Sequence, residues 1–186
     1  MGLTIKFIIL IFVIQLKTLF IMEMNFYILF IAAIVPMVIG FVWYGPLLGN
    51  AWMKEMNFTK ESLEGQNMIK ILVLSYIFSL LIAFFLQYIV IHQMGVFQTL
   101  INEPGFNEQT GEAFTYFQDF IANYGDRFRT FGHGVIHGVM SGIFFVLPIL
   151  SIIAMFEKKS AKYIAINTGY WIVTLAIMGG IICQWL

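Results

Sequence analysis

Long apolar runs separated by shorter polar stretches dominate the chain. A helix that crosses a bilayer needs about 20 predominantly apolar residues. Four runs reach this length, and each is too long and too unbroken for a strand. They cover residues 26–44, 69–91, 131–156 and 163–185. The pattern therefore predicts an all-α fold, a polytopic membrane four-helix bundle.

The composition supports a membrane environment. Of the 186 residues, 60% are hydrophobic and 11% are charged, whereas an average soluble domain has about 45–50% apolar and about 25% charged residues. A soluble chain of this length could not bury so much apolar surface, so the lipid bilayer is the expected solvent for most of it. The formal net charge is zero, which excludes nucleic-acid binding driven by bulk charge.

Charges in the connecting segments predict an orientation. The first and third connections are rich in lysine, as in the stretch EKKSAK, whereas residues 92–130 carry five acidic residues against two arginines. With four spans, the first and third connections share a side, and the positive-inside rule places that side in the cytoplasm. We therefore expect a multi-pass protein of the cytoplasmic (inner) membrane, with residues 92–130 and the C-terminus outside the cytoplasm.

Residues 1–23 form an apolar segment that Lys17 interrupts. The segment has no clear small-residue cleavage site, so a signal peptide fits poorly. Two interpretations stay open: an extra N-terminal helix whose Lys17 reaches the outer interface, or a mis-called start with Met22 or Met24 as the initiator. Neither changes the later spans, so we divide the chain into residues 1–23 and a four-span membrane domain, residues 24–186.

One stretch of the second connection, EAFTYFQDFIANYG, has helical periodicity. Its apolar residues lie on one face and Gly125 is a plausible stop. The residues of that face are Phe114, Phe117, Ile121 and Tyr124. We predict an amphipathic helix, either on the outer face or at the membrane interface, or packed over the ends of the spans.

The three histidines are candidates for metal chemistry. His133 and His137 lie four residues apart in FGHGVIHGVMSG, so they share one helix face. His92 follows the second span, and the predicted topology brings all three imidazoles to the same interface. They could bind zinc, copper, another transition metal or haem, with a carboxylate from Glu112 or Asp119 as a further ligand, or from Asp126. The pair lacks the glutamate of the H-E-x-x-H metalloprotease motif.

Packing is the competing interpretation of the same stretch. Gly134, Gly138 and Gly142 repeat every four residues, a pattern that brings membrane helices close together. Gly179 and Gly180 of the last span are expected level with His137, which also favours helix packing. Under this interpretation the histidines hydrogen-bond neighbouring groups and the protein needs no cofactor. A proton or substrate contact is the third possibility, because ionisable groups in membranes are often functional.

A second candidate cluster lies toward the cytoplasmic side. Asn167 and Tyr170 fall within about two turns of the start of the last span. They are expected level with Trp43 and Tyr44 of the first span, with Trp52 nearby. These residues could line a small pocket for a lipid headgroup or an apolar solute. The alternative is an interfacial aromatic belt with one asparagine that hydrogen-bonds between helices.

Two stretches resemble a known family. They are IGFVWYGPLLGNAWMKEMNFTKE, residues 39–61, and FEKKSAKYIAINTGYWIVTLAIMGGIICQW, residues 156–185. They resemble the bacterial membrane proteins grouped as domain of unknown function 1761, which carry a similar W-Y-x-P-L-x-G-x-x-W turn, an I-N-x-G-Y-W span and an MNF-like start. The resemblance runs from about Met24 to the C-terminus, although the long acidic connection is less typical. It implies a four-span integral membrane protein and no particular activity.

Several functional classes lack support in the sequence. The middles of the spans contain no Asp, Glu, Lys or Arg, which weighs against a familiar ion-coupled pump. No phosphate-binding glycine loop or Ser-His-Asp order is present. We therefore expect a non-catalytic accessory or scaffold subunit of the bacterial inner membrane, as a homo-oligomer or in a larger membrane complex. The alternatives are an oligomeric transporter or carrier for a small solute or lipid, and a metal or haem protein that uses the three histidines.

Overall fold

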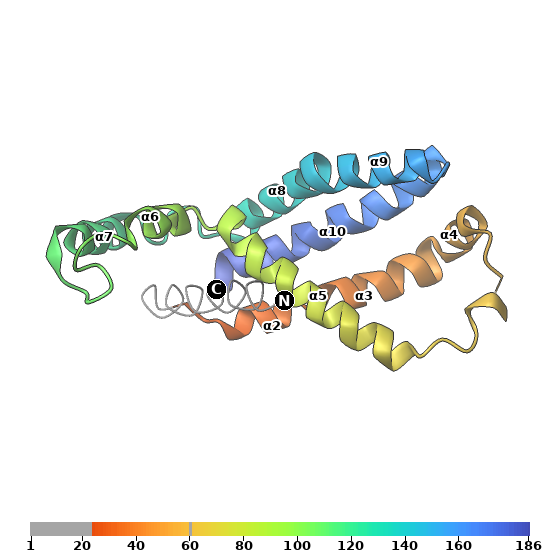
Figure 1. Cartoon of the computed structure of the whole chain (residues 1–186), viewed down its shortest axis with the longest axis horizontal. Helices are drawn as coiled ribbons and strands as arrows, with labels where there is room; N and C mark the ends of the chain where they lie inside the picture. The colour runs from red at the N-terminus through yellow and green to blue at the C-terminus, as the bar shows by residue number, and fades with distance from the viewer. Residues whose placement is uncertain (1–23, 60) are drawn as a thin grey trace, which may run out of the picture.

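The structure is a computed structural model that describes residues 24–59 and 61–186. These residues form helices joined by turns, and they contain no strand (Figure 1). The all-α prediction is confirmed. The two interpretations of residues 1–23, an extra helix or a mis-called start, lie outside the described residues.

Within the described part of the chain, four helical segments are long and apolar enough to cross a membrane. They are Tyr27–Leu47, Met68–Val90, Phe131–Phe156 and Ala161–Trp185. Each coincides closely with one of the predicted runs. The structure thus has the helices expected of a membrane protein.

The first of these segments is broken twice. Helix α2 (Tyr27–Ala32) ends just before Pro36, which lies in the first turn of α3 (Val35–Val42), the position where a missing N–H costs least. A π-helical turn, Trp43–Leu47, follows α3, and the non-helical backbone of Gly45 redirects the chain. The chain continues as α4 (Gly49–Met56), where the sequence predicted only a turn.

The third segment is interrupted in the same way. Helix α8 (Phe131–Ser141) passes through a π-helical turn, Gly142–Val146, into α9 (Leu147–Phe156). Pro148 lies in the first turn of α9. By contrast α5 (Met68–Val90) and α10 (Ala161–Trp185) are continuous.

Helix α10 is the centre of the bundle. In its most apolar stretch 56% of residues are buried, against 17% for α5. It lies closest to α8, where glycines of the two helices meet. A Cβ on Gly134 would lie 2.1 Å from the Gly179 carbonyl oxygen, and one on Gly138 would lie 2.1 Å from that of Leu175. These glycine stripes therefore pack against each other within the chain.

The second connection forms a helical hairpin of its own. Helix α6 (Gln93–Leu100) packs on α7 (Gly111–Tyr124), the amphipathic helix that the sequence predicted. The two enclose a small aromatic core made of Phe97, Phe106, Phe114 and Phe117. The hairpin extends away from the spans (Figure 1), so the apolar face of α7 rests on α6 rather than over the span ends.

The bundle has two distinct ends. The hairpin, the start of α8 and the end of α10 lie together at one of them, which we call the histidine end (Figure 1). Helix α4 and the turn between α9 and α10 lie at the other, which we call the α4 end. The two lysine-bearing connections therefore share one end of the molecule.

Candidate metal centre

Three elements bring the histidines together at the histidine end. His92 lies between α5 and α6, directly after the last turn of α5. His133 and His137 lie one turn apart on α8. The Thr130 side chain accepts a hydrogen bond from the His133 backbone N–H at 3.3 Å. This bond caps the N-terminus of α8 and fixes the position of His133 in its first turn.

The imidazole nitrogens converge on a common point. His133 Nε2 lies 2.9 Å from His92 Nε2 and 3.0 Å from His137 Nε2. The metal-ligating atoms of the three side chains all lie within 4.8 Å of one another. The sequence placed these residues at one level, and the structure supplies the rotation of His92 that the sequence could not give.

Hydrogen bonding among the rings cannot satisfy this arrangement. A neutral imidazole nitrogen carries either one proton or one lone pair in the ring plane. The Nε2 atom of His133 can therefore make a good hydrogen bond to only one of its two neighbours. The other neighbour is then left without a good hydrogen bond from His133, whereas a bound cation could accept the lone pairs of all three nitrogens.

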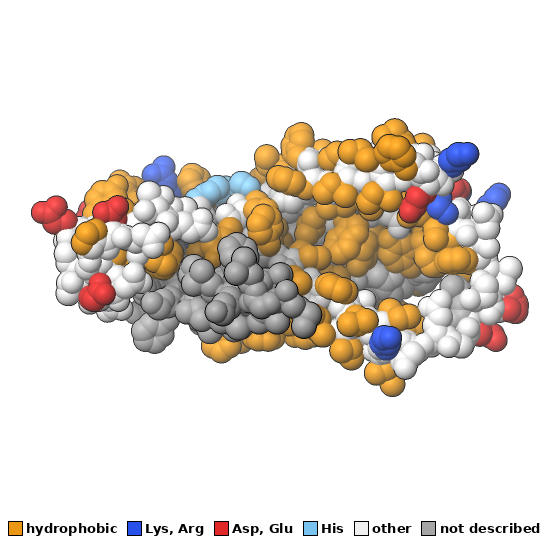
Figure 2. Space-filling view, viewed as in Figure 1, with side chains coloured by type: hydrophobic (Ala, Val, Ile, Leu, Met, Phe, Trp, Pro, Cys, Tyr) orange, Lys and Arg blue, Asp and Glu red, His pale blue; other side chains and the backbone are white. Residues whose placement is uncertain are grey.

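Aromatic and cationic groups surround the cluster. The Phe128 ring stacks on His133 with centroids 5.2 Å apart, and it meets His92 edge-on at 6.1 Å. The Arg127 guanidinium lies 5.3 Å from the Phe128 ring. His92 is exposed, while the other two rings are half-buried. Figure 2 shows histidine side chains (pale blue) at the surface between the hairpin and the spans, so water reaches the site.

The segment before α8 is anchored to the end of α10. Arg129 Nε donates to the Cys183 carbonyl at 2.7 Å, and the Phe131 N–H donates to Gln184 Oε1 at 3.0 Å. Burial lowers the pKa of the Arg129 guanidinium, yet arginine stays charged in proteins. A cation at the last carbonyls of a helix is favourable. These bonds hold Phe128 against the histidines.

The acidic side chains considered as further ligands are not part of this group. Glu112 and Asp119 line a shallow hollow on α7 instead, and Asp126 does not join the three histidines. Sequence reasoning missed Phe128 and Arg127, because nothing in a single aromatic or basic residue marks it as the neighbour of a distant imidazole.

The second predicted cluster is also brought together, at the α4 end. Trp43 Nε1 donates to the Ile166 carbonyl at 3.0 Å, and the Tyr44 hydroxyl donates to Asn167 Oδ1 at 2.9 Å. The Asn167 amide in turn donates to the Tyr163 carbonyl at 2.8 Å. These bonds join the first span to α10.

Aromatic packing completes this second cluster. The Tyr44 ring lies 5.4 Å from Trp52 and 5.1 Å from Tyr170. The Tyr170 hydroxyl donates to the Pro36 carbonyl at 2.9 Å. The adjoining cavity measures about 650 Å³ and is lined by Tyr44, Trp52 and Tyr170. Trp43 and Asn167 do not line it.

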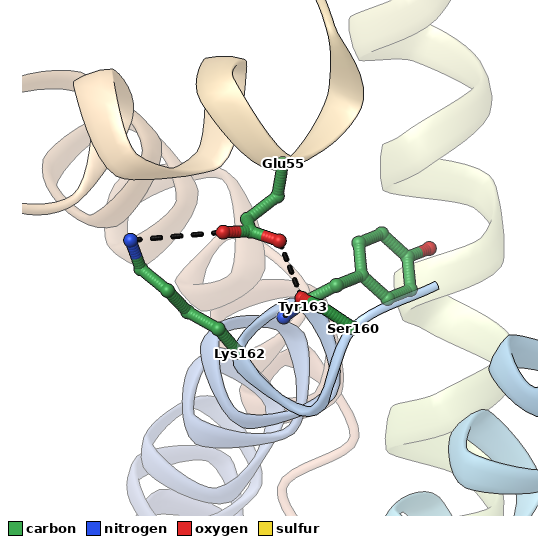
Figure 3. A network of polar contacts seen from close by, with 4 residues as sticks. All are labelled: Glu55, Ser160, Lys162 and Tyr163. Atoms are coloured by element: carbon green, nitrogen blue, oxygen red, sulfur yellow. Dashed lines mark hydrogen bonds and ion pairs between the residues drawn. The ribbon is translucent and has the colours of Figure 1, made fainter. Parts of the chain in front are cut away.

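A polar network outside both predicted clusters ties α4 to α10 (Figure 3). Glu55 accepts a hydrogen bond from the Ser160 hydroxyl and pairs with Lys162 at 3.6 Å. Ser160 also accepts from the Tyr163 N–H at 3.0 Å, which caps α10. Through this network α4 docks on the first turn of α10.

The fold and the site define a helical membrane protein with a histidine cluster at one end. The chain belongs to the family described as "Protein of unknown function (DUF1761)", whose model matches residues 27–183. The resemblance noted in the sequence is thereby confirmed. No curated protein and no solved structure matches the chain.

Proposed function

We propose that this protein is an integral membrane metal-binding protein that holds one transition-metal ion with His92, His133 and His137. The observation that carries the proposal is the convergence of three Nε2 atoms that cannot all hydrogen-bond one another. Imidazole ligands suit zinc, copper, iron and nickel. Three protein ligands leave one position of a tetrahedral site open to water or another molecule.

Zinc is the ion that we expect. A tetrahedral zinc with Zn–N bonds of about 2.0–2.1 Å holds its nitrogen ligands about 3.3–3.4 Å apart. The Nε2 contacts of 2.9 and 3.0 Å need to widen by a few tenths of an ångström, which small rotations of half-exposed rings provide. Haem fits less well, because its two axial imidazoles stand on opposite faces of the macrocycle, whereas these rings touch edge to face.

The proposed setting is the bacterial inner membrane, with four spans and the histidine end outside the cytoplasm. The support is the positive-inside rule together with the placement of both lysine-bearing connections at the α4 end. A reporter fused after Leu186 tests the orientation, and a cytoplasmic signal from it contradicts the proposal. In this orientation the three histidines bind a metal ion that comes from the extracytoplasmic side.

Metal titration of the full chain tests the function. The protein is purified in detergent, stripped with a chelator, and titrated with Zn²⁺ while bound metal is measured by elemental analysis. We expect one ion per chain. Cobalt in place of zinc reports the geometry, because tetrahedral Co²⁺ absorbs strongly in the visible range. A stripped protein that takes up neither ion sinks the proposal, and a haem absorbance band redirects it to haem.

A matched variant separates the histidines from the nearby carboxylates. Asp119→Asn removes an acidic side chain from the hairpin without touching the three rings, so we expect it to bind zinc as the wild type does. His92→Ala removes a ligand and should abolish stoichiometric binding. If Asp119→Asn loses the metal instead, the three-histidine site is wrong.

A further inference from the structure

A cavity of about 340 Å³ lies at the base of the hairpin, directly beside the histidine cluster. Its walls come from the start of α6, the last turns of α7 and the turn that leads into α8. They consist of His92, Gln93, Phe120, Tyr124, Arg127 and Phe128, and we call the space that they line the hairpin cavity. Pockets for small molecules measure about 300–1,000 Å³, so this one suits a small molecule. Because His92 belongs both to its wall and to the histidine cluster, an occupant lies next to the proposed metal site.

The wall of the hairpin cavity carries positive charge and no negative charge. Arg127 is a wall residue, whereas the carboxylate-bearing Asp126 that precedes it is not, and none of the six wall residues is acidic. Among the described residues Arg127 forms no ion pair, so its charge is available to a ligand. A metal ion held by His92 adds further positive charge at the same wall. These charges favour an anion as the occupant.

Local contacts hold the arginine in place. Its guanidinium carbon lies 5.8 Å from the centre of the Tyr124 ring and 5.3 Å from that of Phe128, distances at which a cation is attracted to an aromatic ring. The backbone on either side is fixed by Gln93, which is 3% exposed and whose Nε2 donates to the Tyr124 carbonyl at 2.7 Å and the Arg127 carbonyl at 3.0 Å. A positioned guanidinium loses less freedom when it binds an anion.

The other wall residues favour a flat apolar group attached to the anion. Phe120, Tyr124 and Phe128 contribute three aromatic rings, and the first two lie with centroids 5.5 Å apart. Aromatic side chains bind a further ring well through offset or edge contacts. A bare inorganic ion would leave these surfaces without a partner, whereas an aromatic acid uses them together with the charge.

We propose that the hairpin cavity binds a small aromatic carboxylate, with the carboxylate on Arg127 and the ring against the aromatic walls. The planar guanidinium suits a carboxylate because two of its N–H groups match the two oxygens. Zinc beside His92 strengthens this binding by electrostatic attraction, and by linkage the acid strengthens zinc binding by the same factor. The coupling to zinc rests on the proposed function, whereas the acid site itself does not.

Displacement of a fluorinated probe tests the ligand class. The probe 4-fluorobenzoate is titrated with full-length protein in a neutral detergent, its binding is followed by fluorine NMR, and it is then displaced by benzoate, benzamide or acetate. We expect benzoate to displace the probe at a concentration at least ten-fold lower than the other two require. Equal displacement by acetate would mean that the rings contribute nothing, and equal displacement by benzamide that the charge contributes nothing. Either result, or a wild type that does not bind the probe, overturns the proposal.

Paired variants locate the site. Arg127→Gln should weaken probe binding at least ten-fold, while Lys70→Gln, which removes an exposed cation far along the chain from the hairpin, should leave it unchanged. Phe120→Ala removes a wall residue and should weaken binding several-fold. Tyr116→Ala removes an exposed ring from the same helix outside the cavity and should have no effect. If Arg127→Gln binds the probe as the wild type does, the anion lies elsewhere and the proposal fails.

Titrations with and without Zn²⁺ separate the acid site from the metal site. Zinc should lower the dissociation constant of the probe at least three-fold in the wild type. His137 is part of the histidine cluster but not of the cavity wall, so His137→Ala should keep the zinc-free affinity and lose the effect of zinc. A protein that binds zinc but not the probe contradicts this inference alone, and one that binds the probe but no zinc contradicts the proposed function alone. Zinc that binds without changing the affinity for the probe overturns the coupling.

Discussion

At the histidine end, three imidazole nitrogens meet with too few hydrogen-bond partners among themselves, whereas at the α4 end Tyr44, Asn167 and Tyr170 are hydrogen-bonded within the chain. Helix packing differs between the two ends in the opposite sense: it is tight at the histidine end and looser toward the α4 end. Glycines bring α8 and α10 into backbone contact near the histidines, while α5 leaves the bundle toward the α4 end and opens a crevice.

The difference separates two kinds of polar cluster. A buried polar network whose members are all hydrogen-bonded stabilises one arrangement and needs no further ligand. Tyr44 and Asn167 form such a network. A convergent set of nitrogens that cannot satisfy one another is more stable with a cation bound, and a rigid backbone keeps it ready. Tight packing beneath His133 and His137 supplies that rigidity.

The largest expected effect follows from filling the packed interface. In Gly138→Ala the new Cβ would lie 2.1 Å from the Leu175 carbonyl oxygen, so α8 and α10 must separate. Overpacking of this kind costs about 1–3 kcal/mol and occasionally more, and backbone on the opposing side puts this variant at about 3 kcal/mol or above. Unfolding in mixed micelles measures the loss.

Gly132→Ala is the matched control for that variant. It lies on the same helix, and a Cβ there meets no atom within 4 Å. We expect its free energy of unfolding to equal or exceed that of the wild type, because alanine favours helix over glycine. Equal losses in the two variants would show that the close approach does not govern stability.

The next effect is on metal affinity. His133 lies in contact with both other imidazoles, so His133→Ala should raise the zinc dissociation constant by at least about 100-fold. Zinc at 100 times the wild-type dissociation constant should stabilise the wild type by about 2.7 kcal/mol and the variant by about 0.4 kcal/mol or less. Thermal unfolding with and without zinc measures both. Zinc stabilisation that persists in the variant argues for a different site.

A smaller effect is expected at the α4 end, on stability alone. Tyr44→Phe leaves Asn167 Oδ1 without its donor, which should cost about 1 kcal/mol. Zinc binding should stay the same. Tyr116→Phe, at an exposed tyrosine, is the matched control and should change neither quantity. If Tyr44→Phe lost zinc binding, the α4 end would also influence the metal site, and the two ends would no longer differ in that respect.

The smallest effect concerns the network of Figure 3. Lys162 is 56% exposed in its pair with Glu55, so Lys162→Gln should cost about 0.5 kcal/mol or less and should matter less at high salt. Ser160→Ala removes the cap of α10 as well as a bond to Glu55, and should cost about 1 kcal/mol. Unfolding at two salt concentrations separates the two. A larger loss of stability in Lys162→Gln than in Ser160→Ala would mean that the ion pair, rather than the hydrogen bonds of Ser160, holds α4 against α10.

The sequence by itself determined the helical spans, because a run of about 20 apolar residues in a bilayer has no stable alternative to a helix. It also determined that His133 and His137 share a face and that α7 is amphipathic, since both follow from a period of 3.6 residues. The glycine spacing indicated a close helix contact for the same reason. Each of these is a local property of the chain.

Only the tertiary structure decided how those local pieces meet. The rotation of α5 that brings His92 to His133, the docking of α4 on Ser160, and the packing of α7 on α6 depend on contacts between residues far apart in the sequence. The crevice depends on the angle at which α5 leaves α10, which no single helix encodes. Helix rotation and crossing angle are set by the fit of whole side-chain surfaces, and a pattern along one chain carries no record of that fit.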